Sequence, residues 1–581
     1  MMMTAEEIRK RILDVVLENG GHLASSLGAV EIAMALKKVF DPEKDRILWD
    51  VGHQAYAWKI MTGRNERFET LRRMDGVSPF PNPAESPADA AVAGHAGSAL
   101  SVALGMAAAR DRKGTDEQIV AVIGDGSIVN GHSFEAINNA AAATEKVIVV
   151  LNDNDMAISK PAGSFARALG RLLTGVRYNR VKNAVETVGH KLRLTFLRDL
   201  YHRIESRVKG LFLENRLFEN YGLRYIGPID GHDLTALENA FTVAKEDKRS
   251  VIVHVVTQKG RGYGPAEENP TKYHGVGPRK RSVECGEGER PKSWSQVFGE
   301  AMIELARDDS RIVALTAGMT DGTGLAGFAE VFKDRLFDVG IAEGHMVGFA
   351  AGLAAGGLKP VVAVYSTFLQ RAVDQVIHDV AIAKLPVVFC VDRAGVVGAD
   401  GVTHQGLYDI ALLRTVPNLT ICQPKDAEDL KALLREALVR QGPTVIRYPR
   451  GTVPRSSLIP PPSSLLPHPS SLLPPRFAIW ATGDWYAKAC AVAERVGGVA
   501  VHARYLKPFD SKLLADQRAA GMKIVSLENG AVAGGFGEAI GAELKFGWPD
   551  AFVPHGSPAE LERRFGLSED DIVRTIQTEI T

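Results

Sequence analysis

Short runs of β-branched and other apolar residues recur along this chain, each followed by a tail of glycine and polar residues. Helical patterns lie between them, and this alternation is typical of parallel sheets covered by helices on both faces. The sequence therefore predicts an α/β protein. Ligands of such sheets bind beyond the carboxyl ends of the strands, so the polar tails are the first candidates for chemistry. The clearest runs are QIVAVIGDG, KVIVVLNDN, PVVAVYSTF, PVVFCVDRAG, TVIRYPRG and KIVSLENG.

The charge balance and the hydropathy of the chain argue against nucleic-acid and membrane partners. The chain carries 69 Lys and Arg against 69 Asp and Glu, which gives it no overall attraction for nucleic acid or an anionic membrane. We interpret the basic segment 160–209, which has few aromatic residues, as a solvated amphipathic face. No apolar stretch is long enough to span a bilayer, and MMMTAEEIRKR lacks the apolar core of a signal peptide. We expect a cytoplasmic protein with no nucleic-acid and no membrane partner.

Two shifts in composition predict linkers between domains. The stretch from Gly277 to Lys292 is charged, rich in Gly and Pro, and without periodicity. Residues 456–476 repeat a seven-residue unit three times, as SSLIPPP, SSLLPHP and SSLLPPR. Prolines in every unit exclude a continuous helix, so this segment is predicted to be an extended connector. We assign it no function.

One pair of strand tails predicts a site for a metal ion and phosphate. The first tail is Gly124-Asp125-Gly126, and the second ends at Asn154, 29 residues after Asp125. This spacing fits a strand-helix-strand unit that returns beside its start, which brings both side chains to one sheet edge. Asp and Asn supply the oxygen ligands that Mg²⁺ prefers, and glycines let the backbone approach phosphates at a helix N-terminus. A plain strand-end turn is the alternative for a lone GDG, but the paired NDN disfavours it.

The GDG-to-NDN spacing resembles the diphosphate and magnesium signature of thiamine diphosphate enzymes. Other strings, in the same order from about residue 5 to the C-terminus, resemble the 1-deoxy-D-xylulose-5-phosphate synthase family. They include WDVGHQAY, AGHAGSALS, KGRGYGPAE, YHGVG, IAEGH, YSTFLQRAVDQ, DRAGVVGADGVTHQG and RYPRG.

The resemblance implies a fold, a reaction and cofactors. The implied fold is α/β, with three doubly wound domains, mostly parallel sheets, and a transketolase-like thiamine diphosphate-binding architecture. Its parts would be a diphosphate-binding domain (1–285), a pyrimidine-binding domain (286–453), a Pro/Ser/Leu-rich linker (454–475) and a C-terminal transketolase-like domain (476–581). The implied enzyme is a homodimeric transferase with thiamine diphosphate and Mg²⁺. It would decarboxylate pyruvate and join the remainder to D-glyceraldehyde 3-phosphate, a step that feeds isoprenoid, thiamine and pyridoxal synthesis.

The same resemblance assigns cofactor-binding residues. Glu343 in IAEGH matches the carboxyl that lies beside the aminopyrimidine ring and promotes its imino tautomer, which acts as an internal base. We expect the preceding DVGIA to be a strand that leads into a Gly-rich turn. Phe368 matches the aromatic platform under that ring, although a core phenylalanine is the competing interpretation. The full cofactor set is His53, His95, Ala96, Gly97, Gly124, Asp125, Gly126, Ser127, Asn154, Lys259, Tyr263, Glu343 and Phe368, with Asp125, Asn154 and Met156 as metal ligands.

Histidines and arginines complete the implied site. Imidazoles suit proton transfers near neutral pH, although any single histidine can equally be structural. The catalytic set is Glu343, His22, His53, His274 and His404. A phosphorylated acceptor requires fixed cations, and Arg393 and Arg450 follow what we take to be consecutive strands; salt bridges are the alternative. The substrate-binding set is Tyr365, Arg393, Asp400, His404 and Arg450.

Two departures from the family pattern leave alternatives open. Gly344 stands where Gln is usual, and the common GHSSTS is replaced by Gly94-His95-Ala96-Gly97-Ser98, which removes two hydroxyls near the implied diphosphate. We expect weaker cofactor affinity rather than its loss. The alternatives are a transketolase or 2-oxo acid dehydrogenase E1 component, and a non-catalytic paralogue. Retention of Glu343, Asp125 and Asn154 argues against the paralogue.

Overall fold

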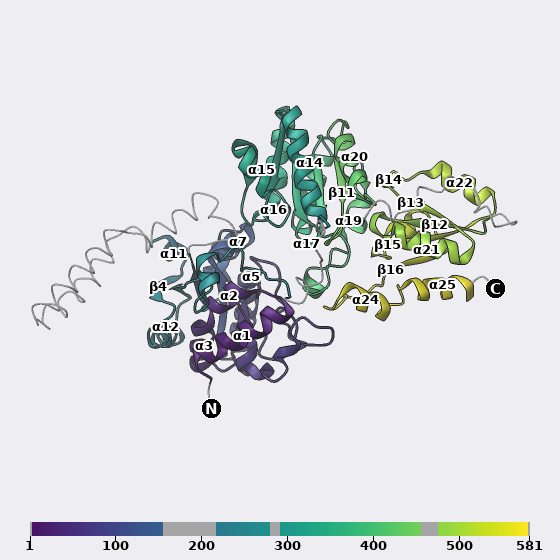
Figure 1. The fold of residues 1–581 in the computed structure, drawn as a ribbon. Coiled ribbons are helices and arrows are strands. Elements are labelled where there is room, and N and C mark those ends of the chain that lie inside the picture. Colours follow the sequence, from purple (N-terminus) through teal and green to yellow (C-terminus); the bar gives the residue numbers. More distant parts are fainter. Residues whose placement is uncertain (1–2, 155–215, 279–290, 455–474, 579–581) are drawn as a thin grey trace, which may run out of the picture. The chain divides into compact units, whose positions relative to one another are not determined.

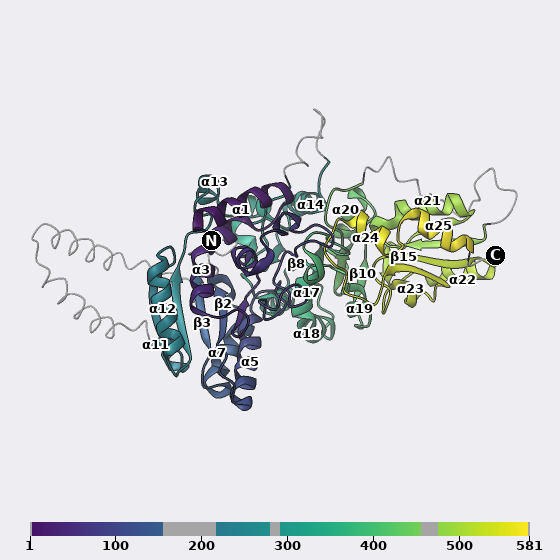
Figure 2. The same ribbon diagram turned by 90° about the horizontal axis from the view of Figure 1, so that it is seen from below.

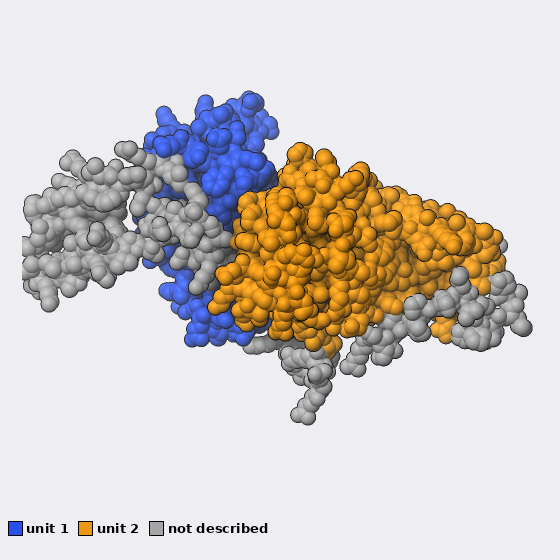
Figure 3. All heavy atoms as spheres, turned by 90° about the horizontal axis from the view of Figure 1, so that it is seen from above, with its two compact units in different colours: residues 1–69, 80–278 blue, residues 70–79, 279–581 orange. Residues whose placement is uncertain are grey.

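The computed structural model describes residues 3–154, 216–278, 291–454 and 475–578. Met156, the basic segment 160–209 and nearly all of both predicted linkers lie outside these ranges. The chain forms two compact units: unit 1 comprises residues 1–69 and 80–278, and unit 2 comprises residues 70–79 and 279–581 (Figure 3). In the described ranges, no helix combines the length and the apolar content that a membrane span requires.

Unit 1 is built on a five-stranded parallel sheet in the order β1-β2-β3-β5-β4. Its edge strand β4 packs against α12 (Figure 1). Helix α5 packs against α7 and against β2 of the sheet. Helix α3 also packs against α12. The strands are β1 (Arg46–Trp49), β2 (Ile119–Gly124), β3 (Ile148–Asp153), β4 (Arg224–Asp230) and β5 (Val251–Val256). The principal helices are α1 (Ala5–Asn19), α2 (Leu23–Gly28), α3 (Val30–Val39), α5 (Ala99–Lys113), α7 (Gly131–Ala143) and α12 (Leu234–Glu246).

Unit 2 contains a seven-stranded sheet in the order β14-β10-β11-β9-β8-β6-β7, in which only β14 runs antiparallel to its neighbour. Alternate residues of β8 enter two separate hydrophobic cores, since Val362 and Val364 pack with α16, and Val361 and Ala363 pack with α14 and α20. The strands are β6 (Ile312–Thr316), β7 (Leu336–Asp338), β8 (Lys359–Tyr365), β9 (Val388–Asp392), β10 (Thr420–Cys422), β11 (Thr444–Arg447) and β14 (Tyr505–Lys507). The helices are α14 (Trp294–Asp308), α16 (Glu343–Ala355), α19 (Asp409–Arg414) and α20 (Ala427–Ala437).

Unit 2 also contains a four-stranded parallel sheet in the order β13-β12-β15-β16. Helices α21 and α25 cover one face, and α22 and α23 cover the other (Figure 2). The strands are β12 (Phe477–Ala481), β13 (Val499–His502), β15 (Lys523–Ala531) and β16 (Leu544–Trp548), and the helices are α21 (Tyr486–Val496), α22 (Ser511–Ala519), α23 (Phe536–Ala539) and α25 (Glu569–Thr578).

The predicted α/β class with mostly parallel sheets is confirmed, and the six runs form β2, β3, β8, β9, β11 and β15. The prediction for DVGIA is wrong over most of its length, because β7 ends at Asp338. The Asp338 carboxylate accepts hydrogen bonds from the Gly318 and Gly340 amides at 2.8 and 3.0 Å, which turns the chain at the strand end. The three-domain division with boundaries at 285, 453 and 475 stays a prediction.

Candidate cofactor and substrate sites

Asp125 and Asn154 lie side by side at the carboxyl edge of the sheet in unit 1. Strands β2 and β3 pair in parallel with Gly124 opposite Asn152, and Asp125 begins the short helix α6 (Asp125–Ile128). The Asp125 carboxylate accepts a hydrogen bond from the Gly126 amide at 2.7 Å and one from the Asn154 amide at 3.3 Å. The strand-helix-strand unit predicted from the 29-residue spacing is therefore present.

The chemistry of this edge fits a hard divalent cation. Burial raises the pKa of Asp125, and the Lys259 ammonium opposes that rise. Burial in turn lowers the pKa of Lys259, against the pull of Asp125. The side-chain oxygen of Asn154 is buried and makes no hydrogen bond within the described residues. A carboxylate beside an unsatisfied amide oxygen is the kind of partial ligand set to which Mg²⁺ adds phosphate and water oxygens. The metal-binding roles of Asp125, Asn154 and Met156 stay predictions.

A buried aspartate that the motif analysis overlooked holds the turn between residues 94 and 99. The Gly97 amide donates to both carboxylate oxygens of Asp50, at 3.0 and 2.9 Å, and the Ala99 amide donates at 3.1 Å. Asp50 is 1% exposed and follows β1 directly, while Ala99 begins α5. An anion at a helix N-terminus is stabilised by the free amides there. The sequence did carry a signal for Asp50, because in WDVGHQAY it is an acidic residue directly after the end of a strand.

Three of the predicted catalytic histidines come together in unit 1. His22 precedes α2, His53 follows β1, and His274 lies far along the chain. The ring centroids of His22 and His53 are 6.1 Å apart, those of His22 and His274 are 5.7 Å apart, and those of His53 and His274 are 5.3 Å apart. The Ser25 hydroxyl lies 3.3 Å from His274 Nδ1, which helps to fix that ring.

Burial keeps His53 and His274 uncharged near neutral pH. The pKa of His53 falls well below its ordinary value because the ring is buried and His274, His22 and Lys259 lie nearby. Burial, with a smaller contribution from Lys259, lowers the pKa of His274 to about 4. His53 Nδ1 is buried and makes no hydrogen bond within the described part of the chain. Neutral imidazoles of this kind can accept and return protons at pH 7.

We expect the cofactor-free protein to lose stability on acidification partly through His274. The unfolded chain binds a proton at that ring below an ordinary pKa of about 6.5, but the folded protein does so only below about 4. The stabilisation is therefore present above pH 6.5 and is lost as the pH falls toward 4, by up to about 1.4 kcal/mol per pH unit. Urea unfolding at pH 7.5, 6.5, 5.5 and 4.5 measures this slope. His274→Gln should flatten it and the exposed control His132→Gln should not; equal slopes in all three proteins contradict the assignment.

Polar side chains behind the NDN tail fix its geometry. The Asn152 amide nitrogen donates to Gln54 Oε1 at 2.8 Å, and the Thr257 hydroxyl donates to Asn152 Oδ1 at 2.6 Å. His254, fully buried, lies between Asp153 at 3.1 Å and the Tyr225 hydroxyl at 2.7 Å. Supporting hydrogen bonds of this sort orient metal ligands. Sequence reasoning missed these residues because their partners are distant in the chain.

The remaining predicted residues of unit 1 lie on segments that contact this region. The Gly260 amide donates to the Ala24 carbonyl at 2.8 Å, which attaches the KGRGY segment to α2. Tyr263 precedes α13 (Gly264–Glu268), and its ring lies 5.7 Å from that of Tyr273. Ser127 is buried in α6, and its carbonyl accepts a hydrogen bond from the Ser133 hydroxyl at 2.8 Å. The carbonyl of His95, four residues before α5, lies 3.4 Å from the Ser98 hydroxyl.

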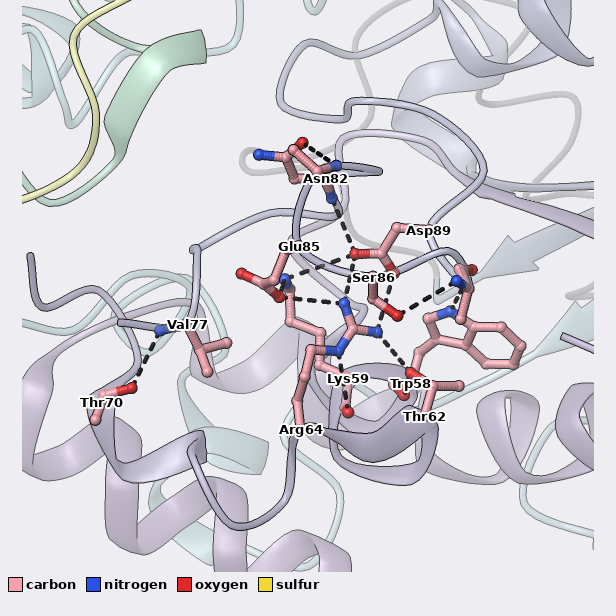
Figure 4. A network of polar contacts seen from close by, with 12 residues as sticks. Trp58, Lys59, Thr62, Arg64, Thr70, Val77, Asn82, Glu85, Ser86 and Asp89 are labelled. Atoms are coloured by element: carbon pink, nitrogen blue, oxygen red, sulfur yellow. Dashed lines mark hydrogen bonds and ion pairs between the residues drawn. The ribbon is translucent and has the colours of Figure 1, made fainter. Parts of the chain in front are cut away.

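A buried ion-pair network anchors the irregular chain that leads to Gly94 (Figure 4). Lys59 Nζ lies 2.6 Å from Glu85, and the Arg64 guanidinium lies 2.5 Å from Asp89. The Asp89 carboxylate also accepts a hydrogen bond from the Asn82 amide at 2.9 Å. Removing one partner from such a buried pair typically costs about 3–5 kcal/mol, because the other charge is left uncompensated. The network thus holds residues 82–89 against α4 (Tyr56–Lys59) and the helical turn that follows it (Ile60–Arg64).

In unit 2, Glu343 and Phe368 occupy positions that suit the roles predicted for them. Glu343 is the first residue of α16, is 2% exposed, and accepts a hydrogen bond from Arg371 at 3.2 Å. Burial raises the pKa of Glu343, although Arg371 opposes the rise. A Cβ at Gly344 would lie 3.1 Å from Gln375 Oε1, so the departure at 344 leaves room for that side chain. Phe368 is half-buried, stacked on Tyr365 with ring centroids 5.7 Å apart.

Cationic and polar side chains gather at the carboxyl edge of the seven-stranded sheet. Tyr365 ends β8, Arg393 follows β9, and Arg450 follows β11. These strands are neighbours in the sheet, but β9 and β11 are not consecutive in the chain as expected, since β10 intervenes. The Arg393 guanidinium lies 3.7 Å from the centroid of the Tyr365 ring and donates to the Gly322 carbonyl at 3.0 Å.

Asp400 forms ion pairs with two arginines, Arg450 and Arg72, and no sequence motif had pointed to Arg72. Its carboxylate lies 3.0 Å from Arg450 and 2.8 Å from Arg72. Arg72 belongs to the segment 70–79 of unit 2 and adopts φ +67°, a conformation uncommon outside glycine. The predicted residue His404 lies nearby in the same loop as Asp400, with its ring 5.6 Å from that of Phe368.

The loop that carries Asp400 and His404 is closed at its base and held by the C-terminal part of unit 2. Gly395 and Gly406 exchange two backbone hydrogen bonds of 2.7 Å. The Val396 amide donates to Asn529 Oδ1 at 3.1 Å, and the Gln405 side chain donates to the Pro554 carbonyl at 3.0 Å. We refer to residues 395–406 as the 395–406 loop. Its position depends on residues more than a hundred positions later in the chain.

Comparisons with known proteins found relatives that cover nearly the whole chain. The family described as 1-deoxy-D-xylulose-5-phosphate synthase matches residues 1–257, and the transketolase pyrimidine-binding domain matches residues 290–456. A 1-deoxy-D-xylulose-5-phosphate synthase of Desulforudis audaxviator is 44% identical over 99% of this chain and 94% of its own. The synthase of Carboxydothermus hydrogenoformans is 44% identical over 98% and 95%. A solved transketolase from Campylobacter jejuni is 16% identical, with a TM-score of 0.45, over 99% of this chain and 100% of its own.

Proposed function

Because the chain belongs to the 1-deoxy-D-xylulose-5-phosphate synthase family, we infer that it is a transferase that joins pyruvate to D-glyceraldehyde 3-phosphate with loss of carbon dioxide. The observation that carries this inference is the 44% identity over 99% of the chain to a relative of that name. The product is 1-deoxy-D-xylulose 5-phosphate. Through this product, we propose, the protein contributes to isoprenoid, thiamine and pyridoxal synthesis.

We propose thiamine diphosphate and Mg²⁺ as the cofactors. When bound, thiamine diphosphate would supply a thiazolium ring whose carbon between nitrogen and sulfur can act as a nucleophile, and the cationic ring can accept the electron pair that carbon dioxide leaves behind. On unit 1, Asp125 and Asn154 would bind the metal ion, and the glycines at 124 and 126 would admit the diphosphate. On unit 2, the buried Glu343 carboxyl would hold a proton against the aminopyrimidine ring, and Phe368 would lie under it. The hydrogen bond from the Asn154 backbone amide to the Asp125 carboxylate and the unsatisfied side-chain oxygen of Asn154 support the first assignment. Burial of Glu343 supports the second.

The histidines of unit 1 would transfer protons, and the arginines and polar residues of unit 2 would bind the acceptor substrate. Uncharged His53 and His274 suit proton transfers during carboligation. Each neutral ring can accept a proton, and because burial lowers its pKa, the protonated ring gives that proton up readily. Arg393 and Arg450 would bind the phosphate of the acceptor, because guanidinium groups match phosphate oxygens in pairs. Tyr365, Asp400 and His404 would orient the rest of the acceptor.

A product assay tests the proposed function. Purified protein with thiamine diphosphate, Mg²⁺, carboxyl-labelled pyruvate and glyceraldehyde 3-phosphate should release labelled carbon dioxide and form the deoxyxylulose phosphate in equal amounts. Use of xylulose 5-phosphate without any use of pyruvate would instead indicate a transketolase. Decarboxylation of pyruvate without carboligation, and only in a parallel assay that contains an added artificial electron acceptor, would indicate a 2-oxo acid dehydrogenase component. Absence of all three reactions would indicate the non-catalytic paralogue.

We also propose a homodimer located in the cytoplasm. Both assignments rest on the family resemblance, and sedimentation equilibrium of the purified protein measures the first. A mass of twice 62.7 kDa is expected. Sedimentation as a single chain at micromolar concentration contradicts the dimer.

Arg450→Ala is expected to raise the KM for glyceraldehyde 3-phosphate by about 10- to 100-fold, because a charge-assisted hydrogen bond contributes about 1.5–3 kcal/mol. The kcat at saturating acceptor and the KM for pyruvate should change much less, since Arg450 would bind only the phosphate. Steady-state kinetics with each substrate varied separately gives the measurement. Arg435→Ala is the matched control, because Arg435 is exposed to a similar degree, 48% against 46%, and pairs with Glu304. A larger change in the KM for pyruvate than in that for the acceptor would refute the role.

A further inference from the structure

Gly97 is the point at which three segments of unit 1 meet. Its amide donates to Asp50, and its carbonyl lies 3.5 Å from the Ser133 hydroxyl. The same hydroxyl donates to the Ser127 carbonyl at 2.8 Å, so Ser133 connects the turn at residues 94–99 to the tail that follows Asp125. Gly97 adopts φ +86°, a conformation that side-chain-bearing residues rarely take. Both peptide groups of this glycine are therefore fixed by neighbouring segments.

Asn130 fills the space in which a side chain at residue 97 would stand. A Cβ at Gly97 would lie 2.6 Å from Asn130 Oδ1, 2.9 Å from its Cγ and 3.2 Å from its Cβ. Asn130 is 2% exposed and precedes α7, where its Oδ1 accepts a hydrogen bond from the His132 amide at 3.0 Å. Its own amide donates to the Ser127 carbonyl at 3.1 Å. Because the backbone and side chain of Asn130 are both held, its carboxamide cannot withdraw easily from Gly97.

Gly97 stands where the family pattern has a hydroxyl-bearing side chain, and Asn130 occupies the space that such a side chain would need. We propose that Asn130 is a positioning residue of the cofactor site: its carboxamide replaces the side chain that residue 97 lacks and keeps the turn at 94–99 against the Asp125 tail. Positions 97 and 130 can accommodate only one of the two side chains. This proposal rests on the proposed function, because the site that it describes is the diphosphate-binding part of that function.

A double-mutant cycle tests the coupling. The variants are Gly97→Ser, Asn130→Gly and the two combined. Asn130→Gly is suitable because glycine replaces asparagine at a helix N-cap at little cost. Gly105→Ser is the matched control. Gly105 lies within α5, the helix that follows the turn at residues 94–99, and a Cβ at this position would have no atom within 4 Å. Each protein is examined by thermal unfolding without cofactor and by calorimetric titration with thiamine diphosphate in the presence of Mg²⁺.

We expect Gly97→Ser to lower the unfolding midpoint by about 3 °C or more and to weaken cofactor binding at least about tenfold, as expected for overpacking at a strained position. Adding Asn130→Gly should recover the part of both losses that the contact with Asn130 causes, while the cost of placing a side chain at φ +86° remains. Asn130→Gly alone should raise the cofactor concentration needed for half-maximal activity while leaving kcat at saturating cofactor nearly unchanged. The control should behave as the wild-type protein does.

The proposal is overturned if the double variant is no better than Gly97→Ser, or if Gly97→Ser resembles Gly105→Ser. It is also overturned if the coupling affects only the unfolding midpoint while all variants bind the cofactor equally, since Asn130 would then have a structural role alone. Failure of the proposed function has a different signature, because the wild-type protein would then give no heat with thiamine diphosphate and Mg²⁺.

Discussion

Glu343→Gln is expected to lower kcat by about 10²- to 10⁴-fold, the range typical of a lost general acid–base group. Glutamine keeps the size of the side chain and can still accept a hydrogen bond from Arg371, but it cannot carry the proton that the carboxyl exchanges. The raised pKa of the buried Glu343 is consistent with a group that holds a proton more readily than an exposed carboxylate does. Steady-state carboligation with saturating substrates and cofactor provides the measurement.

Two comparisons separate this role from a structural one. Calorimetry should show that Glu343→Gln still binds thiamine diphosphate, because the residues that we propose as metal and diphosphate ligands belong to unit 1. The control Glu304→Gln changes an exposed glutamate, 55% exposed and paired with Arg435, and should leave kcat unchanged. A Glu343→Gln protein with kcat within a factor of three of wild type would sink the assignment.

Asp125→Asn is expected to weaken Mg²⁺-dependent cofactor binding by at least about 100-fold. Substitution of a residue that only supports a metal ligand typically costs 10- to 100-fold in affinity or activity, so loss of the charge on a direct ligand should cost at least the upper end of that range. Asparagine retains an oxygen that can accept the hydrogen bonds from the Gly126 and Asn154 amides, so the turn should persist. Calorimetric titration with thiamine diphosphate at fixed Mg²⁺ measures the change.

The control for this substitution is Asp116→Asn, at an aspartate that is 84% exposed and paired with Lys44. It should bind the cofactor as the wild-type protein does. Circular dichroism of Asp125→Asn should show an unchanged fold. Normal cofactor affinity in Asp125→Asn, at Mg²⁺ concentrations that are not saturating, would show that this carboxylate does not bind the metal ion.

The sequence was sufficient to predict contacts that parallel strands impose. Asp125 and Asn154 follow neighbouring strands, and the carboxyl ends of parallel strands share an edge, so their proximity follows from chain order. The same reasoning placed Tyr365, Arg393 and Arg450 at one edge in unit 2. It misjudged the strand order only where β10 intervenes, because the pairing of a three-residue strand leaves little trace in the hydrophobic pattern.

Contacts made by irregular segments were not predictable in this way. Arg72 reaches Asp400 from a segment with no periodicity, and Asp50 binds amides 47 and 49 residues later. The turn after β7 depends on side-chain hydrogen bonds of Asp338, which end the strand earlier than its apolar run suggests. The relation between Gly97 and Asn130 appears only when backbone dihedrals and side-chain positions are known together.

The attachment of the 395–406 loop to Asn529 and Pro554 limits how such an enzyme can be recombined with its relatives. A chimaera joined within the Pro-rich connector would combine a loop from one parent with its supporting residues from another. Only crossovers that inherit residues 395–406 together with 529–554 preserve those contacts. The four-stranded sheet and the segment after it must therefore be inherited together with residues 395–406 if these hydrogen bonds are to persist, although they supply no predicted ligand of their own.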